Sequence, residues 1–266
     1  MYRNTFLSVM FLACCFNGSL CAQSDAQIYE RTCDAKTYPF SDPSPVATPN
    51  NSYYPYFRFD GFSMQAQEKQ WKMVVLENDY VKLTVTPEIG GKIWGAIDKV
   101  NNKEFVYTNG VVKFRDVAMR GPWTSGGIEF NFGIIGHAPT CSTPIDYLTK
   151  KNVDGSVSCH IFSYEWITRT VWNVEINLPK DKAYFTTHTT WFNQSSIDQP
   201  YYQWMNAGYA TKTGTRFYYP GTYSIGHSGD LHPYPIDEEG RDVSWYDNNN
   251  FGASKSLQYF GKNLPR

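Results

Sequence analysis

The sequence predicts an all-β protein, and two observations support this fold class. Apolar and polar residues alternate in short runs, as in residues 80–86, where Val81, Leu83 and Val85 would face inward. Turns rich in Asn, Asp, Gly and Pro separate these runs, and no segment has an amphipathic 3.6-residue period of helical length. Regularly spaced strands with such turns are typical of sandwiches and barrels. We therefore expect a large antiparallel β-sandwich.

Residues 1–22 have the pattern of a secretory signal peptide. Arg3 supplies a positive charge, residues 6–16 are apolar, and a small-residue cleavage site ends at Ala22. The apolar run is too short to span a membrane. We expect a secreted or periplasmic protein. The alternative is a lipid anchor at the cell surface, on one of Cys14, Cys15 and Cys21.

The chain then divides into an arm and a body. Residues 23–69 are rich in Pro and Tyr and contain few apolar runs, so we expect an extended N-terminal arm. Residues 70–266 form the sandwich domain. Its strands are expected at residues 73–77, 80–86, 92–98, 104–107, 158–167, 169–178, 183–193 and 201–211, with an extended stretch at 126–133.

The composition limits the class of partner. The chain has 266 residues with 24 basic and 25 acidic side chains, so it lacks the excess of positive charge typical of nucleic-acid binding. Aromatic residues make up 17% of the chain, which supplies rings for a β core and for stacking against sugars. We expect a carbohydrate ligand, no nucleic-acid partner, no membrane span and no cofactor. The oligomeric state does not follow from the sequence.

Three cysteines follow the signal segment, namely Cys33, Cys141 and Cys159. An odd number allows at most one disulfide within the chain, and Cys141 with Cys159 is the favoured pair. The alternative is that these are small buried thiols. No Cys-x-x-Cys or His-plus-Cys spacing indicates zinc, so no metal site is expected.

The stretch from Gly126 to Gly133 has the strongest functional pattern. Ile128, Phe130 and Phe132 would lie on one face of a strand, with Glu129 and Asn131 on the other, and His137 follows eight residues after Glu129. A carboxylate and an imidazole can form a proton-transfer pair, so Glu129 and His137 are the candidate catalytic residues. The alternative is a solvated strand glutamate and a loop histidine.

Further candidates would bind substrate. Tyr202, Trp204 and Asn206 share one face of a predicted strand, which suits a stacking ring beside a polar anchor. Asn131 would lie beside Glu129. His188 lies on a polar strand face, and His227 lies in a loop rich in Tyr and Pro.

Residues 77–107 resemble the opening of the galactose-mutarotase-like superfamily. The matching segments are Glu77-Asn78-Asp79-Tyr80 and Leu83 to Ile93, which includes Pro87 and Gly90-Gly91. With residues 38–43 and the Glu129 stretch, the chain resembles an uncharacterised family of exported bacterial proteins. Members carry a mutarotase-like domain of unknown function, sometimes followed by tetratricopeptide repeats. The resemblance covers residues 37–261 and implies a supersandwich with a carbohydrate site on its concave face.

The chain departs from this superfamily in two respects. Mutarotases use a histidine and a glutamate for proton transfer, but Trp204 and Asn206 occupy the strand where that histidine would be sought. The body also has fewer residues than relatives need to close both sheets. We therefore expect a domain that is incomplete at its C-terminal end, with an unpaired sheet edge.

Two hypotheses about function follow. The first is an exported carbohydrate-active protein that acts on a glycan or an anomeric centre by carboxylate and imidazole acid–base chemistry. As an enzyme it would resemble a glycoside hydrolase or an aldose epimerase. The alternative is a glycan-binding module or scaffold without catalysis. The two differ in whether Glu129, His137, Trp204 and Asn206 converge in one site.

Overall fold

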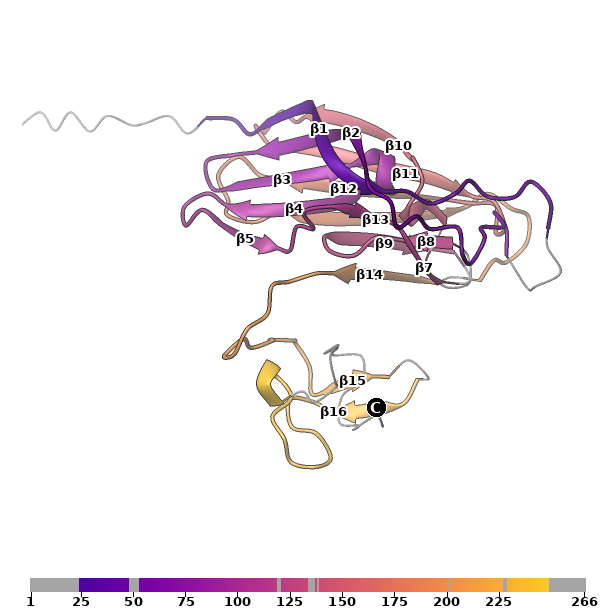
Figure 1. Ribbon diagram of the computed structural model, residues 1–266. Coiled ribbons are helices and arrows are strands. Elements are labelled where there is room, and N and C mark those ends of the chain that lie inside the picture. Colours follow the sequence, from indigo (N-terminus) through magenta and orange to yellow (C-terminus); the bar gives the residue numbers. More distant parts are fainter. Residues whose placement is uncertain are drawn as a thin grey trace, which may run out of the picture.

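The regular secondary structure of the described residues is almost all β-strand, as expected (Figure 1). The computed structural model describes residues 24–47, 53–118, 121–133, 137, 139–200, 202–226 and 229–248. The signal segment lies outside these residues. Among the described residues the helical elements are three short 3₁₀ turns, η1 (Pro87–Ile89), η2 (Pro139–Cys141) and η3 (Tyr246–Asn248). None of the helical segments in the described part of the chain is long and apolar enough to cross a membrane.

The larger sheet has eight strands in the order β14-β9-β4-β3-β2-β1-β6, with β5 paired to β4. All of its pairings are antiparallel except that of β1 with β6. Its strands are β1 (Gln27–Tyr38), β2 (Gln67–Glu77), β3 (Val81–Thr86), β4 (Lys92–Asp98), β5 (Lys103–Val106), β6 (Val112–Lys113), β9 (Ile128–Phe132) and β14 (Gln203–Ala207).

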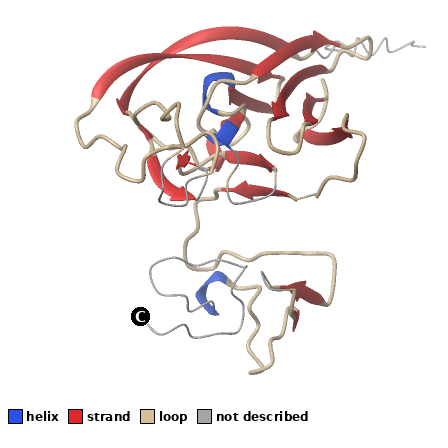
Figure 2. Cartoon of the chain, turned by 90° about the vertical axis from the view of Figure 1, so that its right-hand side faces the viewer, coloured by secondary structure: helices blue, strands red, loops and turns tan. Residues whose placement is uncertain are grey.

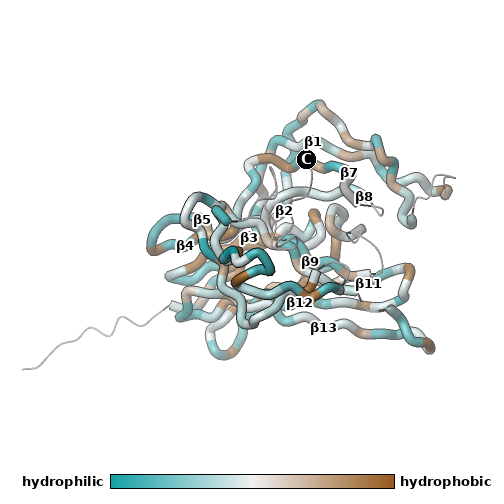
Figure 3. The backbone as a smooth tube through the Cα atoms, turned by 90° about the horizontal axis from the view of Figure 1, so that it is seen from below, coloured by the Kyte–Doolittle hydropathy of each residue, from teal (hydrophilic) through white to brown (hydrophobic). Residues whose placement is uncertain are grey.

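The second sheet packs against the first and completes the sandwich. Its four antiparallel strands run in the order β10 (Asp146–Lys151), β11 (Val157–Glu165), β12 (Thr170–Leu178) and β13 (Thr186–Asn193). A separate ribbon pairs β7 (Arg115–Ala118) with β8 (Gly121–Trp123). In Figure 3, β9 is seen between this ribbon on one side and β12 and β13 on the other.

The main core lies between the two sheets. Val81, Leu83 and Val85 of β3 are buried in it, which confirms the inward face predicted from their alternation. Phe132 of β9 stacks on Trp172 of β12, with 4.5 Å between ring centroids. Burial of such large apolar side chains is the main stabilising contribution to a sandwich. A smaller cluster, which includes Trp71, Met73, Ile89 and Trp94, lies apart from this core.

The expected N-terminal arm contains a strand that the sequence reasoning missed. Residues 27–38 form β1, which pairs with β2 over eleven residues, from Gln27 opposite Glu77 to Thr37 opposite Gln67. Most β1 side chains are exposed or half-buried, so the segment lacks the apolar alternation that indicates a strand. Its backbone pairing holds it in the sheet instead. β2 likewise begins earlier than expected, at Gln67 rather than Met73.

The segment after β14 lies outside both large sheets. It contains the hairpin of β15 (Tyr223–Ile225) with β16 (Leu231–Pro233), and its own small apolar cluster joins Tyr234 and Val243. Figure 2 shows this segment below the main body, connected to it by a single stretch of chain. Within the described residues, β13 pairs only with β12 and leaves one edge of the second sheet unpaired.

Candidate functional site

The candidate site is built on β9, on the side facing away from the main core. Ile128, Phe130 and Phe132 pack into that core, whereas Glu129 and Asn131 point to the opposite face. The alternation read from the sequence is therefore confirmed. Glu129 is only 3% exposed and Asn131 is fully buried. The face is thus covered, and the alternative of a solvated strand glutamate is wrong.

A turn formed by two glycines directly precedes β9. Gly126 and Gly127 have φ of +76° and +66°, in the left-handed region that favours glycine. A β-carbon on Gly127 would also collide with the carbonyl oxygen of Ile93 in β4. Glycine at this position therefore lets the start of β9 lie directly against β4, with Ile128 opposite Ile93.

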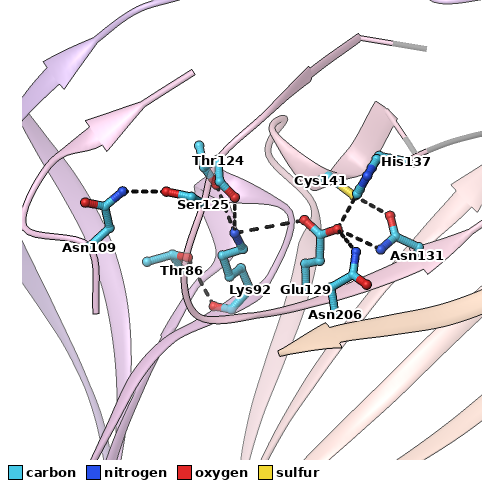
Figure 4. Close-up of polar contacts among 10 residues, drawn as sticks. All are labelled: Thr86, Lys92, Asn109, Thr124, Ser125, Glu129, Asn131, His137, Cys141 and Asn206. Atoms are coloured by element: carbon cyan, nitrogen blue, oxygen red, sulfur yellow. Dashed lines mark hydrogen bonds and ion pairs between the residues drawn. The ribbon is translucent and has the colours of Figure 1, made fainter. Parts of the chain in front are cut away.

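Glu129 lies at the centre of a network of polar side chains (Figure 4). Its Oε1 lies 2.6 Å from Nδ1 of His137 and accepts hydrogen bonds from the Nδ2 atoms of Asn131 at 2.9 Å and Asn206 at 2.8 Å. Its Oε2 lies 4.0 Å from Nζ of Lys92 and has no hydrogen-bond partner. Three donors therefore converge on one oxygen of a buried carboxylate.

The charges of this network influence one another. Burial raises the pKa of Glu129, but the hydrogen bond and charge of His137, with the charge of Lys92 and the Asn131 amide, outweigh it and lower the pKa. Glu129 is consequently ionised at neutral pH. Burial also lowers the pKa of Lys92, against the opposing attraction of Glu129 and Cys141.

Lys92 is a site residue that sequence reasoning missed. It lies at the start of β4, is 1% exposed, and donates from Nζ to the carbonyl oxygen of Thr124 at 2.5 Å and to its Oγ1 at 3.1 Å. Lysine is rarely buried without a partner. Its burial could have been suspected from the sequence, because Lys92 begins a mostly apolar strand and lies on the same face as Trp94, two residues later.

Strand β14 adds the aromatic side of the site. Asn206 lies opposite Glu129 and Trp204 lies opposite Asn131, so the shared face predicted for these β14 residues adjoins Glu129. The Trp204 ring packs edge-on against His137 with centroids 5.6 Å apart, and Tyr202 packs against Trp204 at 4.8 Å. Trp123 of β8 lies 5.9 Å from the His137 ring. His137 is therefore bordered by two tryptophans.

Cys141 joins the site through η2, and the sequence did not indicate its place there. Its Sγ donates to Oδ1 of Asn131 at 2.8 Å. The favoured disulfide of Cys141 with Cys159 is wrong, because both residues are buried thiols that form no disulfide, as the alternative held. Cys159 belongs to the main core on β11, whereas Cys141 lies on the far side of β9 beside Asn131.

Two predicted binding residues do not join this site. His188 is exposed on β13 and lies opposite Glu175, on the outer face of the second sheet. The sandwich core therefore separates it from Glu129, and His188 does not join the Glu129 site. His227 lies outside the described residues. The site thus brings together Glu129, Asn131, His137, Tyr202, Trp204 and Asn206 of the predicted set.

Comparisons with known proteins agree with this fold. A family described as "Domain of unknown function (DUF5107)" matches residues 48–265. The chain is also similar to a solved structure of a TPR-domain containing protein from Parabacteroides distasonis, with 25% sequence identity and a TM-score of 0.71. That match covers 83% of this chain and 38% of the solved one, so the chain spans well under half of that neighbour's length.

Proposed function

Because the chain belongs to the DUF5107 family, whose function is unknown, we propose its function from the geometry of its own site. The protein is an exported carbohydrate-active protein that exchanges a proton at the anomeric centre of a sugar. The contact of 2.6 Å between Glu129 Oε1 and His137 Nδ1, beside the ring of Trp204, carries this proposal. A pair of residues suited to proton transfer thus lies next to an aromatic ring.

The hydrogen-bond pattern assigns the proton between the two residues. An ionised carboxylate only accepts hydrogen bonds, so Nδ1 of His137 must donate to Oε1 of Glu129. Nε2 is then the nitrogen that exchanges a proton with substrate, as a base in the neutral ring and as an acid in the imidazolium. His137, with its side chain 22% exposed, is the proposed catalytic group.

Glu129 acts through His137 in this scheme. Its side chain is 3% exposed and its Oε1 is occupied by three donors, so it is poorly placed to take a proton from a sugar directly. A buried carboxylate beside an imidazole fixes the ring's tautomer and orientation. Glu129 is therefore proposed as the positioning residue, in place of the direct base suggested by the sequence.

Aromatic side chains support a sugar as the substrate. Tyr202 is 38% exposed and directly precedes β14, and Trp204 is half-buried within β14, the strand that carries Asn206. Flat amphipathic rings beside a polar amide suit the apolar face and hydroxyl edge of a sugar ring. The likeness of residues 77–107 to the galactose-mutarotase-like superfamily also supports this assignment. Export, to the periplasm or the medium, is part of the proposal and rests on residues 1–22.

A second candidate is a glycan-binding module without catalysis. The three contacts of Glu129 Oε1 favour it, because an oxygen in contact with three donors can serve to hold His137 and Asn206 in place without taking part in catalysis. In that case the rings of Tyr202 and Trp204 would bind a glycan and His137 would be structural. The two candidates differ in turnover rather than in binding.

The test is a screen of mono- and oligosaccharides by thermal shift, followed by proton NMR of anomeric exchange and of bond cleavage for each ligand found. It is run on the wild type and on His137→Gln. His160→Gln is a matched control, because His160 also lies near a glutamate, 3.7 Å from Glu175, but on the second sheet.

The proposal expects turnover in the wild type and in His160→Gln, and a loss of roughly 10²- to 10⁴-fold in His137→Gln with binding retained. Binding without turnover in all three proteins would establish the module instead. If no sugar binds to the wild type, both candidates fail.

A further inference from the structure

Three side chains of the site bear atoms that commonly bind metals. A carboxylate oxygen of Glu129, a ring nitrogen of His137 and the Sγ of Cys141 all lie within 4.8 Å of one another. They form the one such group found among the described residues. We propose that Glu129, His137 and Cys141 bind a divalent transition-metal ion of the zinc class. This inference goes beyond the proposed function, because it adds Cys141 and holds whether or not the site turns over sugar.

The combination of ligands indicates the type of ion. A thiolate selects zinc and similar borderline metals, and imidazole and carboxylate complete a mixed set, whereas magnesium and calcium prefer oxygen alone. Three protein ligands leave one tetrahedral position for water or another ligand. The proposed centre therefore has the composition of an open zinc site rather than a closed structural one.

The local chain places the three ligands close together. They lie within thirteen residues, on β9, in the following loop and on η2. Ligand atoms on one zinc ion, each at about 2.0–2.3 Å from it, lie about 3.3–3.7 Å apart in tetrahedral geometry. Small movements from the present positions reach this separation. The ion would replace two protons, the one that His137 Nδ1 shares with Glu129 Oε1 and the one on the Cys141 thiol, and both would be released to solvent.

Unpartnered polar atoms provide an independent observation. Buried side-chain polar atoms normally have a hydrogen-bond partner. Among the described residues, those without one belong to Trp123, Glu129, Thr140 and Ser142. Glu129 is a proposed ligand, Trp123 packs on His137, and the other two flank Cys141 in the sequence. A bound ion with its water would supply partners where these residues lie.

Surrounding side chains would hold the ligands in place. Asn131 donates to Glu129 Oε1; in the metal-free protein it also accepts from the Cys141 thiol, a hydrogen bond that Cys141 would give up on becoming a thiolate ligand. Asn206 also donates to Glu129 Oε1. Such outer hydrogen bonds orient the ligands of metal sites and raise their affinity.

The full chain, reduced and stripped with a chelator, would be titrated with Co²⁺ as a spectroscopic probe for zinc. The expected result is a single bound ion with a thiolate-to-cobalt charge-transfer band, displaced by Zn²⁺. Cys141→Ser should lose this band and Cys33→Ser, the matched control, should keep it, because Cys33 lies on β1 outside the site.

His137→Gln serves as a second variant if Cys141→Ser does not fold. It should weaken Co²⁺ binding by more than the roughly 10- to 100-fold that loss of an outer-shell partner costs. Zn²⁺ should also protect Cys141, but not Cys33, from alkylation in the wild type. The proposal is overturned if the wild type shows no thiolate band, if the band survives in Cys141→Ser, or if His137→Gln binds with unchanged affinity.

Discussion

Asn206 lies directly opposite Glu129 in the pairing of β14 with β9, and its Nδ2 donates to Glu129 Oε1 over 2.8 Å. The two residues are 77 positions apart in the chain. The hydrogen bonding of Glu129 therefore depends on the folded sheet and not on its sequence neighbours alone, and so does its lowered pKa, to which Lys92 of β4 contributes. Ionisation of this carboxylate and stability of the fold are consequently linked.

The first prediction is that Glu129 contributes stability that is lost in acid. Its pKa in the folded protein is lowered from the ordinary 4.5, so the unfolded state binds more protons in that range. The contribution is fully present above pH 4.5 and disappears as the pH falls through the lower folded value. In chelated protein, urea unfolding of Glu129→Gln should therefore depend less on pH below 4.5 than unfolding of the wild type.

Glu77→Gln is the control for this measurement. Glu77 also has a lowered pKa, but it lies 24% exposed between Lys99 and Lys82 on the surface. Surface ion pairs contribute little, so its effect on acid stability should be smaller. An identical pH profile for the wild type and Glu129→Gln would contradict the linkage.

The second prediction concerns the cation beside Glu129. Lys92→Met removes a charge that lowers the Glu129 pKa, so that pKa should rise toward 4.5, and the acid loss of stability should become smaller and be complete at a higher pH. At neutral pH the free energy of unfolding should fall by about 1–3 kcal/mol, because the carboxylate keeps its burial and loses a charge partner. Carbon-13 NMR of the Glu129 carboxyl would follow the titration directly.

Lys82→Met is the matched control, since Lys82 pairs with Glu77 at 3.6 Å on the surface. It should leave the Glu129 titration unchanged. A Glu129 pKa that does not move in Lys92→Met would show that the 4.0 Å separation is too long for appreciable coupling.

Much of the site followed from alternation in the sequence. A period of two placed Glu129 beside Asn131, and Trp204 beside Asn206, and both pairs lie as predicted. Alternation gives the face of a strand but not its neighbours in the sheet. The adjacency of β9 and β14 depends on pairing across 77 residues, which a single sequence does not specify.

Features with no local pattern were missed for physical reasons. β1 is held by backbone pairing along β2 and exposes most of its side chains, so it has no apolar period. The sequence does not distinguish a buried lysine such as Lys92 from an exposed strand lysine, because the partners of its amine come from another segment of the chain. Cys141 forms a hydrogen bond with Asn131 rather than a disulfide with another cysteine, because the turn of η2 places its thiol beside that residue.

The third prediction concerns thiol reactivity in the folded, metal-free protein. Cys33 is half-buried, whereas Cys141 and Cys159 are buried, and burial raises the pKa of Cys159 to about 12. The thiolate is the reactive form, so Cys159 should resist alkylation most strongly. Peptide mass spectrometry should find Cys33 modified first, and all three modified in urea. A Cys141–Cys159 cross-link in unreduced protein would contradict the structure.

The last prediction tests the aromatic side of the site. Trp204→Ala removes the ring that packs on His137 and adjoins Tyr202. If a sugar stacks there, its affinity should fall at least roughly tenfold, or about 1.4 kcal/mol, in calorimetric titration. Trp166→Ala is the control, because Trp166 is 68% exposed and follows β11 in the second sheet. Unchanged affinity in Trp204→Ala would show that the sugar does not stack on β14, and the site around His137 would then lack an aromatic surface for sugar binding.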